Sequence, residues 1–165
     1  MKQNMVESKA ISDVTPDHIQ KKVVLRATVA RVWRALTRIE EFGTWFGAKL
    51  AGEIAPGSTI RGPITHPGFQ HFTMEMVVER VEPERVFAFR WHPYAVEPGV
   101  DYSGEPTTLV TFELSAVPEG TSLLVTESGF SHIPAGRRPL AFRMNDQGWG
   151  MQIENISRHL AAAGE

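Results

Sequence analysis

Glu127 is the residue with the most informative chemistry in this 165-residue sequence. It follows Leu123 and Val125 at alternate positions, so in a β-strand its carboxylate points to the face that these apolar side chains bury. A buried carboxylate needs a hydrogen-bond partner, water or a ligand. Three interpretations stay open: a salt bridge at the end of the sheet, for example with Arg90 or an arginine of the last helix, contact with a ligand at the polar end of a pocket, and, third, catalysis.

Asn145 is the second candidate, because it falls one helical turn before Trp149 on an apolar stripe. Its amide would then face the sheet, where it could bind either a ligand or the backbone of a strand. Gly148 and Gly150 flank Trp149, and each weakens a helix by about 1 kcal/mol relative to alanine. We expect these glycines to permit a close approach of helix and sheet, or to mark a kink.

Other kinds of chemistry find no support in the sequence. The histidines at 66, 71, 92 and 132 lack the spacing of metal ligands, so we expect no metal site. There is no cysteine, no Gly-x-Ser-x-Gly motif, and no histidine placed to activate Ser128. Phosphate-binding and dinucleotide-binding glycine motifs are missing too, so we expect no cofactor.

Composition excludes several partners. A formal net charge of -2 lacks the basic character on which nucleic-acid binding depends. No apolar run approaches the roughly 20 residues of a membrane-spanning helix, and residues 1–16 lack the apolar core of a signal peptide. The sequence therefore predicts a cytoplasmic protein that binds no nucleic acid and does not span a membrane.

Helical and strand signals alternate along the first half of the chain. We expect a loosely ordered segment over residues 1–17 and a single domain over residues 18–165. A strand is predicted over residues 19–27, followed by a short helix that Thr28 caps and a second one containing Phe42 and Trp45. The glycines and prolines of residues 48–67 predict two modest strands with tight turns.

Apolar residues alternate with period two in the middle of the chain, and they show helical spacing in its last part. Strands are predicted around Phe72 to Val78, Phe87 to Trp91, Val110 to Leu114 and Leu123 to Glu127, giving about six strands after the two helices. The loop over residues 93–106 is longer than most connections, so it is a lid, a contact surface or simply mobile. From about Pro139 to Ala163 the apolar spacing predicts one long amphipathic helix, the only element long enough to cover the sheet.

This order of elements resembles the START and birch-pollen-allergen-like (SRPBCC) superfamily, in its AHSA-type branch, named after homologues of a heat-shock-chaperone ATPase activator. Four stretches carry the resemblance: Val32-Trp33-Arg34-Ala35-Leu36-Thr37 leading to Trp45-Phe46, Thr111-Phe112-Glu113-Leu114, Leu124-Val125-Thr126-Glu127-Ser128-Gly129-Phe130, and Gly148-Trp149. The chain lacks the branch's usual proline before the first short helix, where Val29 and Ala30 stand.

The resemblance implies an α+β helix-grip fold, in which a curved antiparallel sheet wraps around a long C-terminal helix and leaves an apolar pocket between them. Inward parity then gives the expected ligand-binding residues, which are Phe72, Met74, Met76, Phe87, Phe89, Trp91, Glu127, Asn145 and Trp149. The same side chains could instead fill the space completely as core.

Three functions compete at this point. The first is the binding of a small apolar or aromatic molecule, which Glu127 and Asn145 would orient. The second is an aromatase/cyclase-type enzyme acting on a polyketide-like substrate, in which Glu127 or a nearby histidine moves a proton. The third, less favoured, is a chaperone partner with a coherent exposed patch. A homodimer through the 93–106 loop or an edge strand is possible, although no feature demands it.

Overall fold

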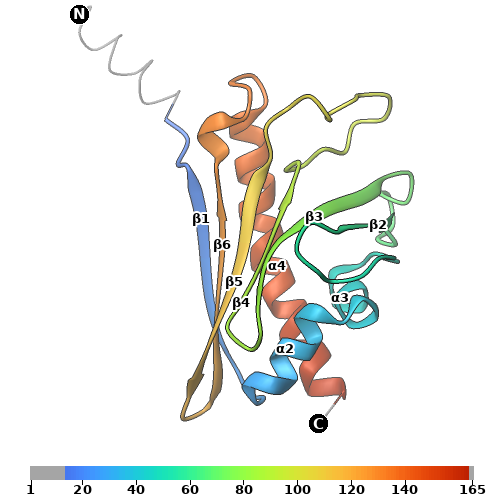
Figure 1. Cartoon of the computed structure of the whole chain (residues 1–165). Coiled ribbons are helices and arrows are strands. Elements are labelled where there is room, and N and C mark those ends of the chain that lie inside the picture. Colours follow the sequence, from blue (N-terminus) through green and yellow to red (C-terminus); the bar gives the residue numbers. More distant parts are fainter. Residues whose placement is uncertain (1–13, 164–165) are drawn as a thin grey trace, which may run out of the picture.

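The computed structural model describes residues 14–163 of the chain. Within these residues six strands form one antiparallel sheet, in the order β1-β6-β5-β4-β3-β2, and three α-helices accompany it (Figure 1). The elements are β1 (His18–Leu25), α2 (Val29–Thr37), α3 (Ile39–Phe46), β2 (Thr59–Pro63), β3 (Thr73–Glu82), β4 (Val86–Trp91), β5 (Thr108–Val117), β6 (Gly120–Ser128), the 3-10 turn η1 (Phe130–His132) and α4 (Arg138–Ala163). The predicted α+β helix-grip class is confirmed. The expected loose N-terminal segment falls largely on residues 1–13, outside the described residues.

The two short helices form where capping and apolar spacing predict them. The Thr28 hydroxyl accepts a hydrogen bond from the backbone N–H of Arg31 at 3.1 Å, which caps the start of α2. Val32 and Leu36 are then fully buried one turn apart. Gly43 in α3 is required by contact rather than by a turn, since a Cβ there would lie 2.3 Å from the carbonyl oxygen of Ala48.

Residues 48–67 contain one strand rather than the two predicted. Residues Thr59–Pro63 form β2, whereas the stretch before it forms isolated bridges, Ala48 to Ile64 and Ala51 to Arg61, in place of a strand. The turn residues of this segment therefore leave too little extended chain for a second ladder. Five strands, not six, follow the short helices.

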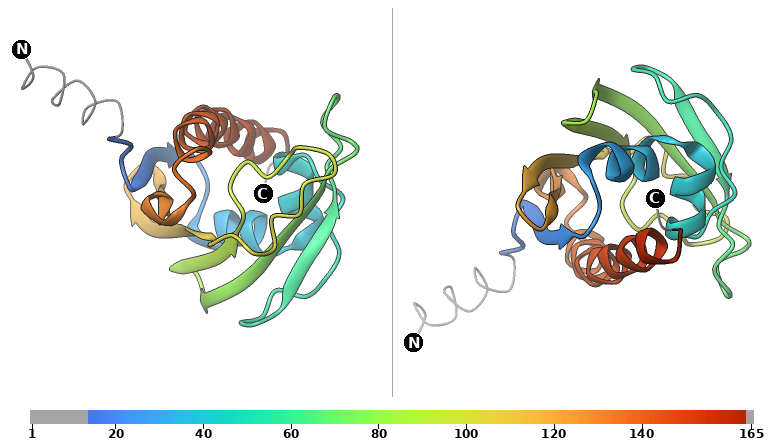
Figure 2. Two further views of the ribbon diagram at one scale, coloured as in Figure 1. Left: turned by 90° about the horizontal axis from the view of Figure 1, so that it is seen from above. Right: turned by 90° about the horizontal axis from the view of Figure 1, so that it is seen from below.

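The sheet buries one face of its alternating strands. Met74, Met76 and Val78 on β3 are at most 2% exposed, and Phe87 and Phe89 on β4 are completely buried. Seen from above and below in Figure 2, the sheet curves from β1 round to β2, and α4 lies across its open side. The apolar core fills the space between them.

The long helix α4 presents the predicted stripe to this core. Trp149, Ile156 and Leu160 are buried, and Asn145 is half-buried. The expected close approach of the sheet at Gly148 and Gly150 is wrong, because a Cβ at either position would meet no atom within 4 Å. Within the described residues, no helix is long and apolar enough to cross a bilayer.

Candidate ligand-binding site

A cavity of about 450 Å³ lies between the β3 side of the sheet and the middle of α4. Its volume falls within the roughly 300–1,000 Å³ that small-molecule sites occupy. The wall is mostly aromatic and aliphatic, with a few polar side chains. The lining residues used below are Phe46, His66, Phe69, Phe72, Met74, Glu75, Trp91, His92, Tyr94, Asn145, Gly148, Met151, Gln152 and Asn155.

The structure divides the predicted site residues into lining and core. Phe72, Met74, Trp91 and Asn145 line the cavity. Trp149 faces a smaller recess that shares Trp91, Asn145 and Gly148 with the cavity wall. The remaining predicted residues are Met76, Phe87, Phe89 and Glu127, which the lining does not include.

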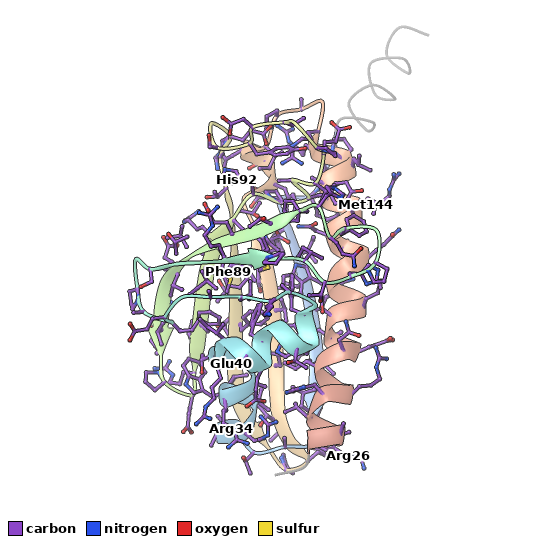
Figure 3. All side chains as sticks on the ribbon, turned by 90° about the vertical axis from the view of Figure 1, so that its right-hand side faces the viewer. Arg26, Arg34, Glu40, Phe89, His92 and Met144 are labelled. Atoms are coloured by element: carbon purple, nitrogen blue, oxygen red, sulfur yellow. The ribbon has the colours of Figure 1, made fainter. Side chains whose placement is uncertain are left out.

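Packing in the core explains why Phe87 and Phe89 do not reach the cavity. Their rings lie 5.7 Å apart and both contact Phe112, on the neighbouring strand β5. Figure 3 shows Phe89 in the middle of the molecule and His92 towards the end where the 93–106 loop lies. The inner part of β4 therefore builds the core, and its last residues build the cavity.

Glu127 lies behind the cavity wall, fully buried, in a shell of uncharged donors. The indole N–H groups of Trp91 and Trp149 donate at 2.8 Å to its two carboxylate oxygens, one to each. The Thr108 hydroxyl donates at 2.6 Å, and the Asn145 amide lies 3.0 and 3.1 Å from the two oxygens. Four neutral side chains from β4, β5 and α4 thus hold one carboxyl group.

The strand register brings these groups together. Trp91 at the end of β4 pairs with Thr108 at the start of β5, and Val110 on β5 pairs with Glu127 on β6. Thr108 shares the parity of Val110, so its hydroxyl faces inward beside the carboxylate. Asn145 and Trp149 then approach from α4, one turn apart.

Burial raises the pKa of the Glu127 carboxyl above its ordinary value of 4.5, against the opposing effect of the hydrogen bonds from Thr108, Trp91, Trp149 and Asn145. Desolvation wins because none of these donors carries a charge. The arrangement favours the protonated form of Glu127 at pH values where an exposed glutamate is ionised.

The predicted salt bridge between Glu127 and Arg90 is wrong. Arg90 pairs with Glu79 on the opposite face, with its Nε atom 3.0 Å from both carboxylate oxygens. The physical reason is strand parity, because Arg90 lies between Phe89 and Trp91, whose side chains point inward.

Asn145 does not bind the backbone of a strand, which was one of the two predictions for its amide. Its amide nitrogen donates to Glu127 rather than to a strand backbone. In this arrangement the amide nitrogen faces the carboxyl group of Glu127, and the amide oxygen is the other polar end of the side chain. The amide oxygen accepts no hydrogen bond from the described residues, and Asn145 lines the cavity, so this oxygen is free to meet a bound molecule.

The 93–106 loop closes one end of the cavity and is held by Arg137. The Arg137 side chain pairs with Glu105 at 2.9 Å, donates to the carbonyl oxygen of Tyr94 at 3.0 Å, and stacks over the Tyr102 ring at 4.9 Å. His92 contacts the Glu105 carbonyl at 3.0 Å. Figure 1 shows this loop beside the start of α4. One arginine therefore joins the loop to the helix.

Several lining residues were not predicted, because they lie in irregular chain. His66 and Phe69 precede β3, and Tyr94 follows β4, where no periodicity indicates which side chain points inward. Thr108 could have been found, since it continues the inward parity of Val110 and Phe112. Among the described residues, no group of three or more His, Cys, Asp or Glu side chains could hold a metal ion.

Solved structures with the same fold are found over most of the chain. Protein MLL2253 from Mesorhizobium loti is 24% identical, with a TM-score of 0.70, and the match covers 90% of this chain and 99% of that one. Protein NE0264 from Nitrosomonas europaea is 22% identical, with a TM-score of 0.69 and coverages of 91% and 98%. These likenesses show the fold.

A third solved structure is DynU16, a protein in the dynemicin biosynthetic locus. It is 25% identical with a TM-score of 0.70, and the match covers 90% of this chain but only 49% of DynU16, so this chain spans about half of that protein. The comparison with curated proteins finds no match.

The family model described as "Activator of Hsp90 ATPase homolog 1-like protein" matches residues 26–161, from the end of β1 to near the end of α4. This range contains the cavity lining, Glu127 and all four of its donors. The chain therefore belongs to the family of Activator of Hsp90 ATPase homolog 1-like proteins, an AHSA-type branch of the SRPBCC superfamily.

Proposed function

We propose that this chain binds a small apolar or aromatic molecule in the cavity between β3, β4 and α4. The observation that carries the proposal is the space at Gly148, which lines the cavity and where even a Cβ would meet no atom within 4 Å. Glycine at this helical position lowers helix stability by about 1 kcal/mol and leaves room in the cavity. A site that had only to be packed would gain from any larger residue here.

The lining supports an aromatic occupant. Phe46, Phe72 and Trp91 present ring surfaces to the cavity, and burying such surface releases about 25 cal/mol per Å². Asn145 adds an oriented polar atom in an otherwise apolar wall, the combination by which small-molecule sites fix a ligand. The structural likeness to DynU16, a protein in a biosynthetic locus, is compatible with a small-molecule ligand.

A matched pair of glycine variants tests the proposal. Gly148→Leu fills the cavity, whereas Gly150→Leu makes the same change two residues on, outside the lining and also in open space. We expect compounds from a panel of flavonoids, polyketides, fatty acids and aromatic acids to raise the melting temperature of the wild type and of Gly150→Leu in a saturable manner, and this shift to be lost in Gly148→Leu.

Two outcomes would contradict the proposal. If no compound shifts the wild type, the cavity is not a binding site for these classes. If a shift persists unchanged in Gly148→Leu, the compound binds elsewhere on the molecule. A homodimer and a cytoplasmic location stay predictions beside this proposal.

In the cyclase-type alternative, the geometry disfavours Glu127 as the acid or base. An acid or base in that reaction must come within hydrogen-bond reach of the substrate, and the oxygens of Glu127 are enclosed by four donors behind the wall. His66 and His92 line the cavity and are the groups on which this alternative now rests. For the chaperone alternative, the exposed large apolar side chains of the described residues are spread over several elements, among them Val24 on β1, Val77 on β3 and Met151 on α4, and this distribution does not favour a single docking patch.

A further inference from the structure

The cavity wall contains few charged side chains. Among the described residues that line it, none is a lysine or an arginine, and the one ionisable acid is Glu75, whose carboxylate lies 3.5 Å from Arg61. Behind the wall, Glu127 adds no positive charge in either protonation state. His66 and His92 are the only basic side chains among the described lining residues, so a carboxylate or phosphate that entered this cavity would give up water without gaining a guanidinium or ammonium partner.

The side-chain amides of the wall either already form hydrogen bonds within the protein or present an acceptor atom to the cavity. Gln152 donates to the carbonyl oxygen of Phe46 at 2.9 Å and accepts from Asn155 at 3.1 Å, so both ends of its amide are engaged. Asn155 in turn accepts from Arg158. Only Asn145 keeps a free atom, the amide oxygen, because Glu127 takes its donor. This wall therefore offers an acceptor for a donor on the ligand.

Aromatic rings make up a large part of the cavity wall. Trp91 lines the cavity with its ring while its N–H donates to Glu127 at 2.8 Å. A hydrogen bond to a carboxyl group polarises the indole towards a more electron-rich ring face. Phe46, Phe72 and Tyr94 add further ring faces, which attract cations and the positive edges of other rings.

We infer that this cavity selects aromatic molecules that are neutral or positively charged and carry a hydrogen-bond donor, and that it rejects the corresponding carboxylates. The inference rests on the proposed function and names the class of ligand. The donor binds the Asn145 oxygen, and the ring packs among Phe46, Phe72 and Trp91.

Three anthracenes that differ in one substituent test this selection: 2-(aminomethyl)anthracene, 2-hydroxyanthracene and anthracene-2-carboxylate. Binding is measured by the change in anthracene fluorescence at pH 8, where the acid is ionised and the amine largely protonated. We expect the amine and the phenol to bind about tenfold or more tightly than the carboxylate, because the carboxylate is an anion that is desolvated without a guanidinium or ammonium partner, and it carries no donor for the Asn145 oxygen.

A charge placed on the cavity rim supplies the matched variant. Met151 lines the cavity and is 60% exposed, so Met151→Lys should fold normally, whereas Gln147→Lys makes the same charge change at an exposed position outside the lining. We expect Met151→Lys to raise the affinity for the carboxylate about fivefold or more and to lower that for the amine. Gln147→Lys should leave the order of affinities as in the wild type.

The outcomes separate this inference from the proposed function. If the carboxylate binds as tightly as the phenol, or if Met151→Lys folds and leaves the preference unchanged, the selection is overturned while the cavity remains a binding site. If none of the three compounds binds, the cavity does not accept aromatic molecules of this size and the proposed function fails with the inference.

Discussion

At the scale of single residues, the carboxyl group of Glu127 is the most constrained group in the described part of the chain. It is fully buried, and two indoles, a hydroxyl and an amide hold it. Each of these donors would be left unsatisfied in a dry environment if the carboxyl group were removed, which costs more than the hydrogen bond itself contributes. The shell and the carboxyl group therefore stabilise one another.

Replacement of Glu127 by glutamine should expose this dependence. The new NH₂ group faces N–H donors, so we expect Glu127→Gln to lower the free energy of unfolding by about 1–3 kcal/mol at pH 4–5. Because burial raises the pKa of the folded Glu127 above 4.5, the unfolded wild type loses its proton first as the pH rises. The wild type thus loses stability relative to the variant above about pH 4.5, and the difference between them narrows until the folded carboxyl group also ionises.

Urea unfolding of both proteins between pH 4 and 8 measures this difference. The variant itself is the control for every other titrating group, since only one side chain changes. A difference that stays constant or widens with pH would mean that the folded Glu127 is ionised at an ordinary or lowered pKa.

Strand parity predicted the inward direction of Glu127 from the sequence, but it could not identify the partners. Trp91, Asn145 and Trp149 were each expected to line the pocket, and the sequence offers no means of showing that three elements converge on one carboxyl group. Applied to Arg90, which alternates with Phe89 and Trp91, the same parity argument would have excluded the predicted salt bridge. The depth of the carboxyl group behind the wall depends on side-chain packing that alternation does not describe.

At the scale of elements, two glycines inside helices have opposite roles. A Cβ at Gly43 in α3 would lie 2.3 Å from the Ala48 carbonyl oxygen, whereas a Cβ at Gly150 in α4 would meet nothing within 4 Å. Both helices carry the same conformational cost of glycine. Only in α3 does the close approach of backbone explain the residue.

Alanine at these two positions should therefore act in opposite directions. We expect Gly150→Ala to raise the free energy of unfolding by about 1 kcal/mol through helix propensity. Gly43→Ala should lower it by about 1–3 kcal/mol, because the Ala48 segment has to move. Thermal and urea unfolding of the two variants beside the wild type check both signs, and a stable Gly43→Ala protein would show that the Ala48 segment yields easily.

Regular elements were the predictable part of this fold. Capping at Thr28, alternation from Met74 to Val78 and helical spacing through Trp149 correspond to α2, β3 and α4. The prediction of a second strand before β2 was wrong, because a segment that forms only isolated bridges contains the same turn residues as one that forms a strand. Helix spacing also could not show that Gly148 faces a cavity, since the sequence pattern is the same for a helical glycine that packs against a sheet and for one beside open space.

At the scale of the whole molecule, Arg137 joins the 93–106 loop to the start of α4. It contacts Glu105, the Tyr94 carbonyl and the Tyr102 ring, three points spread along the loop. Its neighbour Arg138 donates instead to the Ile133 carbonyl at 3.0 Å, outside the loop. Arg137 thus contacts the loop at more points than His92, which contacts the Glu105 carbonyl, and it supports the end of the cavity that Tyr94 lines.

Loss of this side chain should loosen the loop more than the fold. We expect Arg137→Met to speed amide hydrogen exchange over residues 94–105 by about tenfold or more, with little change in the exchange of β5 and β6. Arg138→Met is the matched control and should leave the loop unchanged. Mass spectrometry of deuterium uptake measures both, and equal uptake in the two variants would show that the loop is held by its own contacts.

The arrangement of Trp91 and Trp149 around Glu127 has an optical consequence. Their ring centroids lie 5.8 Å apart at an interplanar angle of 30°, and both indole N–H groups donate to one carboxyl group. Two indoles at this separation share their electronic excitation and give a coupled circular-dichroism band. Trp91 also faces the cavity. The protein thus contains its own chromophore pair, and we expect the proton on Glu127 and any molecule bound in the cavity to change the same spectrum.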